Sequence, residues 1–242
     1  MGIPIRLGID ELERLTTYAA SARWPTGFTL YQRGAPADGL FVVLRGCVVL
    51  RTRLRSGRAF VPRLVGVGEV FGAEGLRVGA TYETDARAEW EAETLHFSRT
   101  RFAMLVRERP RETLALMAQV GEAHSLLLER LRELAMMSVE QRLRAAVDRA
   151  RRARADVAPD GPLTFDAAGY RLLCEMVGAT RESVSLVVNR LVAQGMVERD
   201  GGGIVIPPPS VRTADGVIRR GDRPRASHLG AGQLDLETTL TS

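Results

Sequence analysis

The chain has 242 residues, a formal net charge of +5 and a pI of about 10.0, and 45% of its residues are hydrophobic. This length allows one large domain or two ordinary ones. No apolar run is long enough to cross a bilayer and the N-terminus has no secretion-signal layout, so we expect no membrane segment. Two distant cysteines, Cys47 and Cys174, argue against a disulfide framework and favour the reducing cytoplasm.

All strongly basic residues of the chain are arginines. The simplest interpretation of the missing lysine is codon bias, but the positive charge itself suits a polyanionic partner such as nucleic acid. No glycine-rich phosphate loop, nucleophile motif or cluster of metal ligands occurs in the sequence. We therefore expect no catalytic residues, no metal and no cofactor, and we do not expect an enzyme.

The N-terminal half reads as one helix followed by strands. Residues 8–22 predict a short amphipathic helix with Asp10 as its N-cap and Glu13 three positions later. From Trp24 to about Phe97, short apolar runs alternate with glycine-containing turns, which indicates an antiparallel β sandwich or roll. A single helical turn is expected over residues 101–105.

A long helix is predicted after Pro110, and its apolar residues recur at alternating spacings of three and four. This heptad pattern is typical of a dimer seam. The alternative, a helix packed on its own sheet, stays open. The predicted seam consists of Leu114, Met117, Gly121, His124, Leu128 and Leu131, and continues to Ala135.

The C-terminal third contains a compact unit of two helices and a hairpin. A helix from Ser138 to about Arg154 precedes it, with Ser138 and Gln141 at capping-box positions. Residues 166–177 predict the first helix of the unit, Gly178 a left-handed stop, and Thr180 the cap of the next helix. Helix, turn, helix and a glycine-rich hairpin are typical of a winged helix-turn-helix.

The second helix of this unit begins with polar residues. In a helix-turn-helix, the N-terminal residues of the second helix enter the major groove of DNA. There an arginine can bond guanine and a glutamate can accept from cytosine, so Arg181 and Glu182 are candidate base readers. Thr180, Ser183 and Arg190 are candidate phosphate contacts. An ordinary capped surface helix is the competing interpretation.

Several motifs resemble the Crp/Fnr transcription regulators. They are GATRESVS at residues 178–185, the following NRL and GMV, GAPADGLFVVLRG at residues 34–46, and GEVFG at residues 68–72. The resemblance covers residues 7–206. It implies a homodimer that binds double-stranded DNA at a near-palindromic promoter site and works with RNA polymerase. It also makes Arg181 and Glu182 base readers, and Ser185 matches a serine reader of the Fnr branch. Leu186 departs from the family, which usually has arginine there.

The resemblance also predicts where an effector would bind. Family members that bind cyclic AMP carry a Gly-Glu pair followed by Arg-Ser or Arg-Thr, and this chain has Ala73 at the position of that glutamate. A carboxylate near the expected arginine would repel a phosphate. We expect weak or no cyclic-nucleotide binding and an unknown effector, if one exists. The residues of this candidate pocket are Gly72, Glu74, Tyr82 and Glu83.

Haem and iron–sulfur sensing are disfavoured. The N-terminus has no cysteine cluster, and the candidate haem ligands His96, His124 and Cys47 are expected to be structural. Cys174 is expected to be a buried thiol.

The predicted architecture is an α+β protein with an N-terminal antiparallel β-roll, a long dimerisation helix and a C-terminal winged helix-turn-helix. The expected boundaries are 1–107, 108–137 and 138–206, with a disordered tail at 207–242. The rival hypothesis is a ligand-sensing regulator whose winged domain mainly contacts protein partners.

Overall fold

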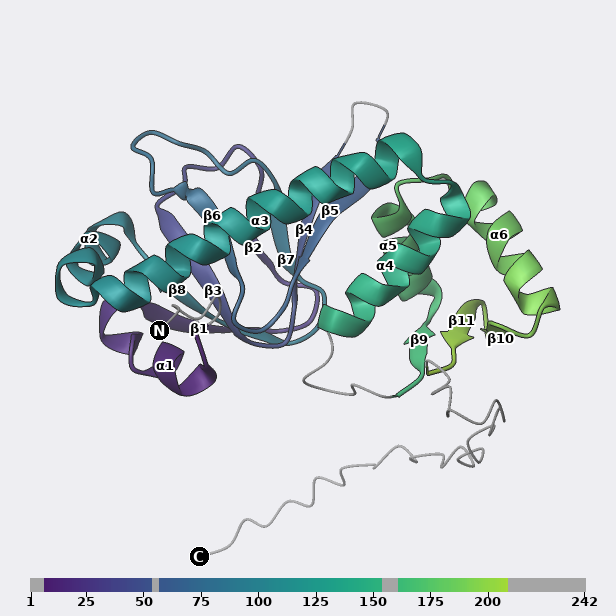
Figure 1. Ribbon diagram of the computed structural model, residues 1–242, viewed down its shortest axis with the longest axis horizontal. Coiled ribbons are helices and arrows are strands. Elements are labelled where there is room, and N and C mark those ends of the chain that lie inside the picture. Colours follow the sequence, from purple (N-terminus) through teal and green to yellow (C-terminus); the bar gives the residue numbers. More distant parts are fainter. Residues whose placement is uncertain (1–6, 54–56, 154–160, 209–242) are drawn as a thin grey trace, which may run out of the picture. The chain divides into compact units, whose positions relative to one another are not determined.

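The computed structural model describes residues 7–53, 57–153 and 161–208 (Figure 1). All of these belong to one compact unit. The predicted tail, apart from its first two residues, lies outside the described residues, and so do residues 154–160. Within the described part, no helix combines the length and apolarity that a membrane crossing requires.

The N-terminal half is the predicted antiparallel roll, built from two four-stranded sheets (Figure 1). Frequent glycine turns let each short strand fold back on a neighbour. Gly39 allows the closest approach, because a Cβ there would lie 1.9 Å from the carbonyl oxygen of Phe97. One sheet has the order β1 (Ala20–Trp24), β8 (Ala92–Phe97), β3 (Gly39–Arg45), β6 (Val70–Gly75). The other has the order β2 (Thr29–Tyr31), β7 (Asp85–Ala88), β4 (Val48–Arg53), β5 (Ala59–Val65).

The N-terminal helix is shorter than predicted. α1 covers only Ile9–Glu13, the 3₁₀ helix η1 covers Thr16–Tyr18, and β1 follows at once. Asp10 is not the N-cap: helix α1 begins after Gly8, whose backbone N–H donates to the Glu11 carboxylate at 2.8 Å. The helical periodicity ends because burial of Leu15 and Tyr18 against the roll overrides local propensity.

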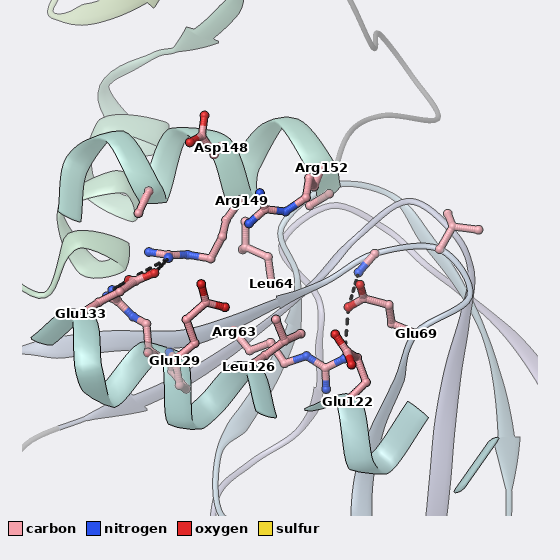
Figure 2. A pocket seen from close by; sticks show the side chains of 16 residues that line it. Arg63, Leu64, Glu69, Glu122, Leu126, Glu129, Glu133, Asp148, Arg149 and Arg152 are labelled. Carbon is pink, nitrogen blue, oxygen red and sulfur yellow. Dashed lines mark hydrogen bonds and ion pairs between the residues drawn. The ribbon is translucent and has the colours of Figure 1, made fainter. Parts of the chain in front are cut away.

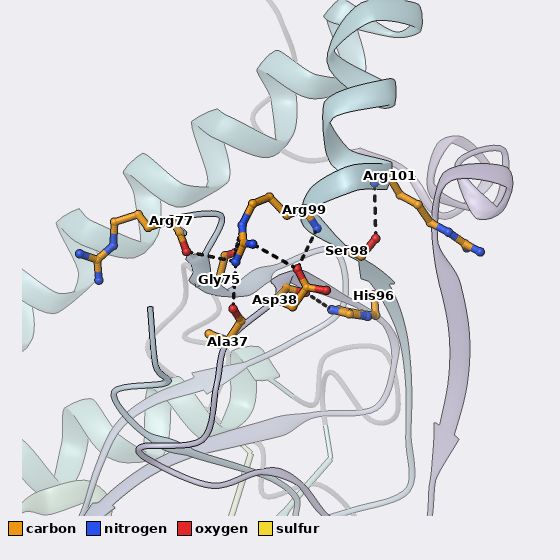
Figure 3. A network of polar contacts seen from close by, with 8 residues as sticks. All are labelled: Ala37, Asp38, Gly75, Arg77, His96, Ser98, Arg99 and Arg101. Atoms are coloured by element: carbon orange, nitrogen blue, oxygen red, sulfur yellow. Dashed lines mark hydrogen bonds and ion pairs between the residues drawn. The ribbon is translucent and has the colours of Figure 1, made fainter. Parts of the chain in front are cut away.

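Helix α2 extends the expected single turn to Arg99–Glu108, with Ser98 as its N-cap. The Arg99 guanidinium at its start donates to the carbonyl oxygens of Ala37, Gly75 and Arg77 (Figure 3). In the same network a ring nitrogen of His96 lies 2.7 Å from the carbonyl oxygen of Asp38. These contacts tie α2 to the loops at the end of the roll and give His96 a structural partner.

Two long helices connect the roll to the C-terminal unit. α3 covers Pro110–Met136, as predicted after the proline. α4 covers Val139–Ala153, and the capping box is confirmed: the Gln141 N–H donates to the Ser138 hydroxyl, and the Ser138 N–H donates to the Gln141 side chain. In Figure 1, α3 runs along the roll and α4 turns back towards the C-terminal helices.

The C-terminal unit contains α5 (Ala167–Val177), α6 (Arg181–Ala193) and the hairpin of β10 (Glu198–Asp200) and β11 (Gly203–Ile206). The hairpin was predicted, but its sheet has a third strand. β9 (Leu163–Phe165) pairs antiparallel with β11, so that Ile204 lies opposite Phe165. The sequence did not predict β9, because three residues are too few for a periodicity to be recognised.

Candidate nucleic-acid interface

The turn between α5 and α6 begins at a left-handed residue, as the sequence predicts. Gly178 has φ +68° and caps α5, and its N–H donates to the Cys174 carbonyl oxygen. Thr180 then caps α6, accepting from the Ser183 N–H at 3.2 Å. The glycine conformation and the threonine cap let the second helix start a few residues after the first one ends.

Helix α6 has one buried face and one exposed face. Its buried side chains are aliphatic and pack into the core that α4, α5 and β11 share. The exposed face begins with Arg181 and Glu182 and continues through Leu186, which is 70% exposed. Asn189 and Arg190 follow on the same side. Two predicted base readers therefore lie at the N-terminal end of an exposed helix face. The buried residues are Val184, Val187, Val188 and Leu191.

The position of Glu182 in the first turn of α6 favours the ionised form of its carboxyl group. Its own backbone N–H, and then the Thr180 hydroxyl, hold the pKa of the Glu182 carboxyl below its usual range. The free N–H groups of the first helical turn produce such an effect. Glu182 is thus ionised at neutral pH and able to accept from a donor such as the amino group of cytosine.

Tyr170 on α5 contacts two of the predicted base readers. The Arg181 guanidinium lies 5.7 Å from the centre of the Tyr170 ring, within the range of a cation–π contact. The Ser185 hydroxyl lies 3.0 Å from the Tyr170 hydroxyl and is partly buried, so Ser185 faces α5 as well as solvent. Tyr170 is the one aromatic residue of α5 and was not among the predicted site residues.

The predicted phosphate contacts differ in their surroundings. The Thr180 and Ser183 hydroxyls lie 3.0 Å apart at the helix start. Arg190, one turn from the C-terminal end of α6, lies 3.4 Å from Glu140 of α4 in an exposed ion pair. Exposed pairs of this kind contribute little to stability, so Arg190 can still turn to an anion.

The predicted dimer seam lies on the outward side of α3. Leu114, Leu128 and Leu131 are 51%, 44% and 61% exposed, whereas Leu116 of the same helix is buried. Gly121 and His124 are exposed and Met117 is half-buried. Leu114, Leu128 and Leu131 thus form an exposed apolar stripe on α3, whereas Met117 packs against the chain's own core.

The candidate effector residues surround a roll interior that is filled by aromatic rings. The Tyr82 ring stacks on the Tyr31 ring at a centroid distance of 3.6 Å, and Phe41 and Phe71 complete the cluster. Burial raises the pKa of both the Tyr82 and the Tyr31 hydroxyls, so both rings are neutral at physiological pH.

The other candidate effector residues surround this aromatic stack. Gly72 is buried, and a Cβ at its position would lie 3.4 Å from the Tyr82 ring. Glu83 is exposed, and its N–H donates to the Glu74 carboxylate at 3.2 Å. The Glu74 charge also contributes to the raised pKa of the Tyr31 and Tyr82 hydroxyls, so a negative charge lies close to this aromatic stack.

The two cysteines and His96 behave as structural residues. Cys47 and Cys174 are both buried, and burial raises the pKa of the Cys174 thiol, which keeps it in the poorly reactive protonated form. His96 stacks on Phe41 with ring centres 4.4 Å apart. Among the described residues, no group of three or more histidine, cysteine or acidic side chains is placed to hold a metal ion.

The winged domain, residues 138–206, is joined to the roll by an ion pair and to α3 by a hydrogen bond. Arg51 of β4 lies 2.6 Å from Glu175 of α5. On α3, Arg130 donates both to Glu133 and to the Met176 carbonyl oxygen at the end of α5. Charge-assisted bonds to the last carbonyls of a helix stabilise its C-terminus, so these residues fix the position of α5 beside the turn.

Glu133 also borders a charged cavity of about 630 Å³ between β5, α3 and α4 (Figure 2). Arg149 of α4 donates to both oxygens of Glu133, at 2.6 and 2.8 Å. Glu129 and Asp148 line the same cavity without a hydrogen bond or ion pair among the described residues. The buried Glu133 carboxylate thus binds Arg130 of its own helix α3 and Arg149 of α4, and so connects these two helices.

Comparisons with known proteins agree with this architecture. Residues 22–109 match the family model of the cyclic nucleotide-binding domain, and residues 141–210 match that of the Crp-like helix-turn-helix domain. The chain is 24% identical over 200 residues to the cAMP-activated global transcriptional regulator CRP of Haemophilus influenzae, covering 81% of this chain and 87% of that protein. It is 25% identical over 206 residues to the cAMP-activated global transcriptional regulator Vfr of Pseudomonas aeruginosa, covering 82% and 94%.

Solved structures share the fold. The c-di-GMP-responsive global regulator CLP of Xanthomonas campestris superposes with a TM-score of 0.69 at 23% identity, covering 82% of this chain and 98% of that one. A Crp/Fnr-family transcriptional regulator from Thermus thermophilus gives a TM-score of 0.63 at 22% identity, covering 77% and 93%. The two matched family models together span more than half of the sequence, in the order roll, long helix, winged domain. The chain belongs to the Crp/Fnr family of DNA-binding transcription regulators.

Proposed function

We propose that this regulator binds a near-palindromic DNA site as a homodimer, with one α6 in the major groove of each half-site. The observation that carries the proposal is the exposed start of α6, where Arg181 and Glu182 face solvent beside the capped turn. A twofold dimer presents two identical helices, which accounts for a symmetric site. Its partners are double-stranded DNA, a second copy of the chain and RNA polymerase.

Dimerisation through α3 is supported by the exposure of the seam. A helix can dimerise through its heptad residues only if these residues are exposed in the monomer. Here Leu114, Leu128 and Leu131 together leave an apolar stripe that a second copy of α3 would cover. Gly121 has no heavy atom within 4 Å of a Cβ built on it, so the monomer itself has no packing need for a glycine there.

We further propose that cyclic AMP does not control this protein, although the curated relatives CRP and Vfr are named as cAMP-activated. Ala73 stands where the resemblance expects a ribose-binding glutamate, and Glu83 stands near the expected arginine. A phosphate there would meet the negative charge of Glu83. The interior of the roll beside these residues is occupied by the stacked rings of Tyr31 and Tyr82, together with Phe41 and Phe71.

Selection of bound sequences from a random DNA pool tests the proposal. The purified protein, without ligand and at physiological salt, is expected to enrich a twofold symmetric site. Arg181→Ala is then expected to lose about 1–3 kcal/mol of binding to that site and to relax one base position. Parallel selections with cyclic AMP and with c-di-GMP, the nucleotide named for CLP, should leave the enrichment unchanged. Enrichment only in the presence of a nucleotide would refute the effector proposal.

The second hypothesis, a winged domain that binds mainly a protein partner, differs in its salt dependence. DNA binding releases counterions, so its affinity falls steeply as salt rises. A protein interface of ordinary composition lacks that steep dependence. If the chain enriches no sequence and its binding to random DNA is insensitive to salt, the protein-partner hypothesis replaces DNA recognition.

A further inference from the structure

The hairpin of β10 and β11 is the wing of the proposed DNA-binding unit, and α6 is its recognition helix. One arginine of the wing faces the recognition helix. In the antiparallel register of the hairpin, Arg199 of β10 lies opposite Ile204 of β11, which is fully buried. Successive side chains of a strand point to opposite faces. Arg199 therefore lies on the helix-facing side of the sheet, and its acidic neighbours Glu198 and Asp200 lie on the other side.

Arg199 contacts the recognition helix directly. Its guanidinium Nη2 donates to the Oδ1 atom of Asn189 at 2.5 Å, and both side chains are exposed. Asn189 lies three residues after Leu186 and seven after Glu182, so the three occupy one exposed stripe of α6. The contact thus joins the wing to the helix face that is proposed to meet DNA.

The hydrogen bond decides what the pair can offer to a ligand. Asn189 uses its acceptor oxygen on Arg199, which leaves its amide NH₂ as a donor. Arg199 keeps the other N–H groups of its guanidinium fork. The Asn189 oxygen keeps a second lone pair, so the remaining free groups of the pair are several N–H donors and one acceptor. A pair whose free groups are mainly N–H donors, one of them carrying a positive charge, matches the oxygens of a phosphate.

The position of the pair on α6 fits the same ligand. With a rise of about 1.5 Å per residue, Asn189 lies about 12 Å along the helix from Arg181. The major groove is about 12 Å wide. When the start of α6 contacts base edges, Asn189 and the wing therefore lie near the sugar–phosphate backbone that borders the groove.

We infer that Asn189 and Arg199 together bind one backbone phosphate of the DNA, with Arg199 as the charged contact and Asn189 as the residue that positions it. This inference rests on the proposed DNA-binding function and adds a contact between helix and wing to it. Such a contact sets the depth and angle of α6 in the groove without reading a base.

Salt titrations of DNA affinity test the inference, with the selected site and a random duplex measured in parallel. Arg199→Ala is expected to weaken both by a similar factor, on the order of tenfold, as one charge-assisted bond is lost. The slope of log affinity against log salt should fall by about 1. Arg199→Lys should keep the slope and lose part of the affinity, because lysine lacks the fork. Asn189→Ala combined with Arg199→Ala should cost less than the sum of the single changes.

Arg101→Ala is the matched control, because it removes the same charge from the exposed surface of α2. If Arg199→Ala behaves like this control, the phosphate contact is refuted while DNA recognition by the wild type stands. If Arg199→Ala weakens only the selected site, Arg199 reads a base and the inference is wrong. A wild type that selects no DNA would remove the proposed function itself. Thermal unfolding of each variant confirms that the fold is unchanged.

Discussion

Replacing Gly178 by alanine tests how the turn before the recognition helix is held. At φ +68° an alanine adopts a left-handed conformation that costs about 1–2 kcal/mol. The added Cβ would also lie 3.0 Å from Cδ2 of Leu134 and 3.2 Å from Cε2 of Phe60. Crowding in a packed core typically costs about 1–3 kcal/mol. We therefore expect Gly178→Ala to lower the free energy of unfolding by about 2–5 kcal/mol, from both effects together.

Gly195→Ala separates the two contributions. Gly195 follows α6 with φ +69°, nearly the same backbone conformation, but no heavy atom lies within 4 Å of its missing Cβ. Gly195→Ala should therefore lower the free energy of unfolding only by the conformational cost, about 1–2 kcal/mol. The difference between the two variants measures the crowding from Leu134 and Phe60.

Denaturant unfolding followed by circular dichroism, compared at equal m-values, measures both losses. DNA affinity should also fall more for Gly178→Ala, because Thr180, the cap of α6, follows it by two residues. Equal destabilisation by the two variants would refute the reasoning, since it would mean that the roll, α3 and the turn are not in tight contact.

Three further predictions concern the seam, the buried carboxylate and the partly buried serine. Leu128→Asp places a charge on the exposed seam and should give a folded monomer; light scattering that still reports a dimer would contradict the seam. Glu133→Gln should destabilise the protein by about 3–5 kcal/mol in denaturant unfolding, because Arg130 and Arg149 lose their shared counter-ion. Glu129→Gln, in the same cavity but without a partner among the described residues, is its control and should be near neutral. Ser185→Ala should relax the selected DNA sequence at one base position and cost about 1 kcal/mol of stability through the lost contact with Tyr170; an unchanged selected sequence would show that Ser185 is not a base reader.

Local signals in the sequence determined the helices and their ends around the interface. Thr180 with Ser183, Ser138 with Gln141, and the left-handed Gly178 all act within about one helical turn. Residue type and spacing are sufficient to predict such contacts, because each cap is formed by neighbours along the chain. The heptad of α3 and the glycine-punctuated strands belong to the same class of signal.

The first helix shows where local signals fail. Residues 8–22 have helical periodicity, yet the helix ends at Glu13. Burial of Leu15 and Tyr18 beside α2 and α3 replaces the second half of the helix by a 3₁₀ turn and a strand. The outcome depends on residues about a hundred positions away, which no local window contains.

Tertiary structure alone decided how the interface is supported. The pairing of β9 with β11, the contact of Tyr170 with Arg181 and Ser185, and the bond between Arg199 and Asn189 each join different elements. The sequence therefore determined which residues begin the recognition helix, since capping is a property of adjacent residues. The tertiary structure determined which side chains contact and orient the first residues of the recognition helix. Such contacts join different elements, and they form only when the buried faces of these elements pack together.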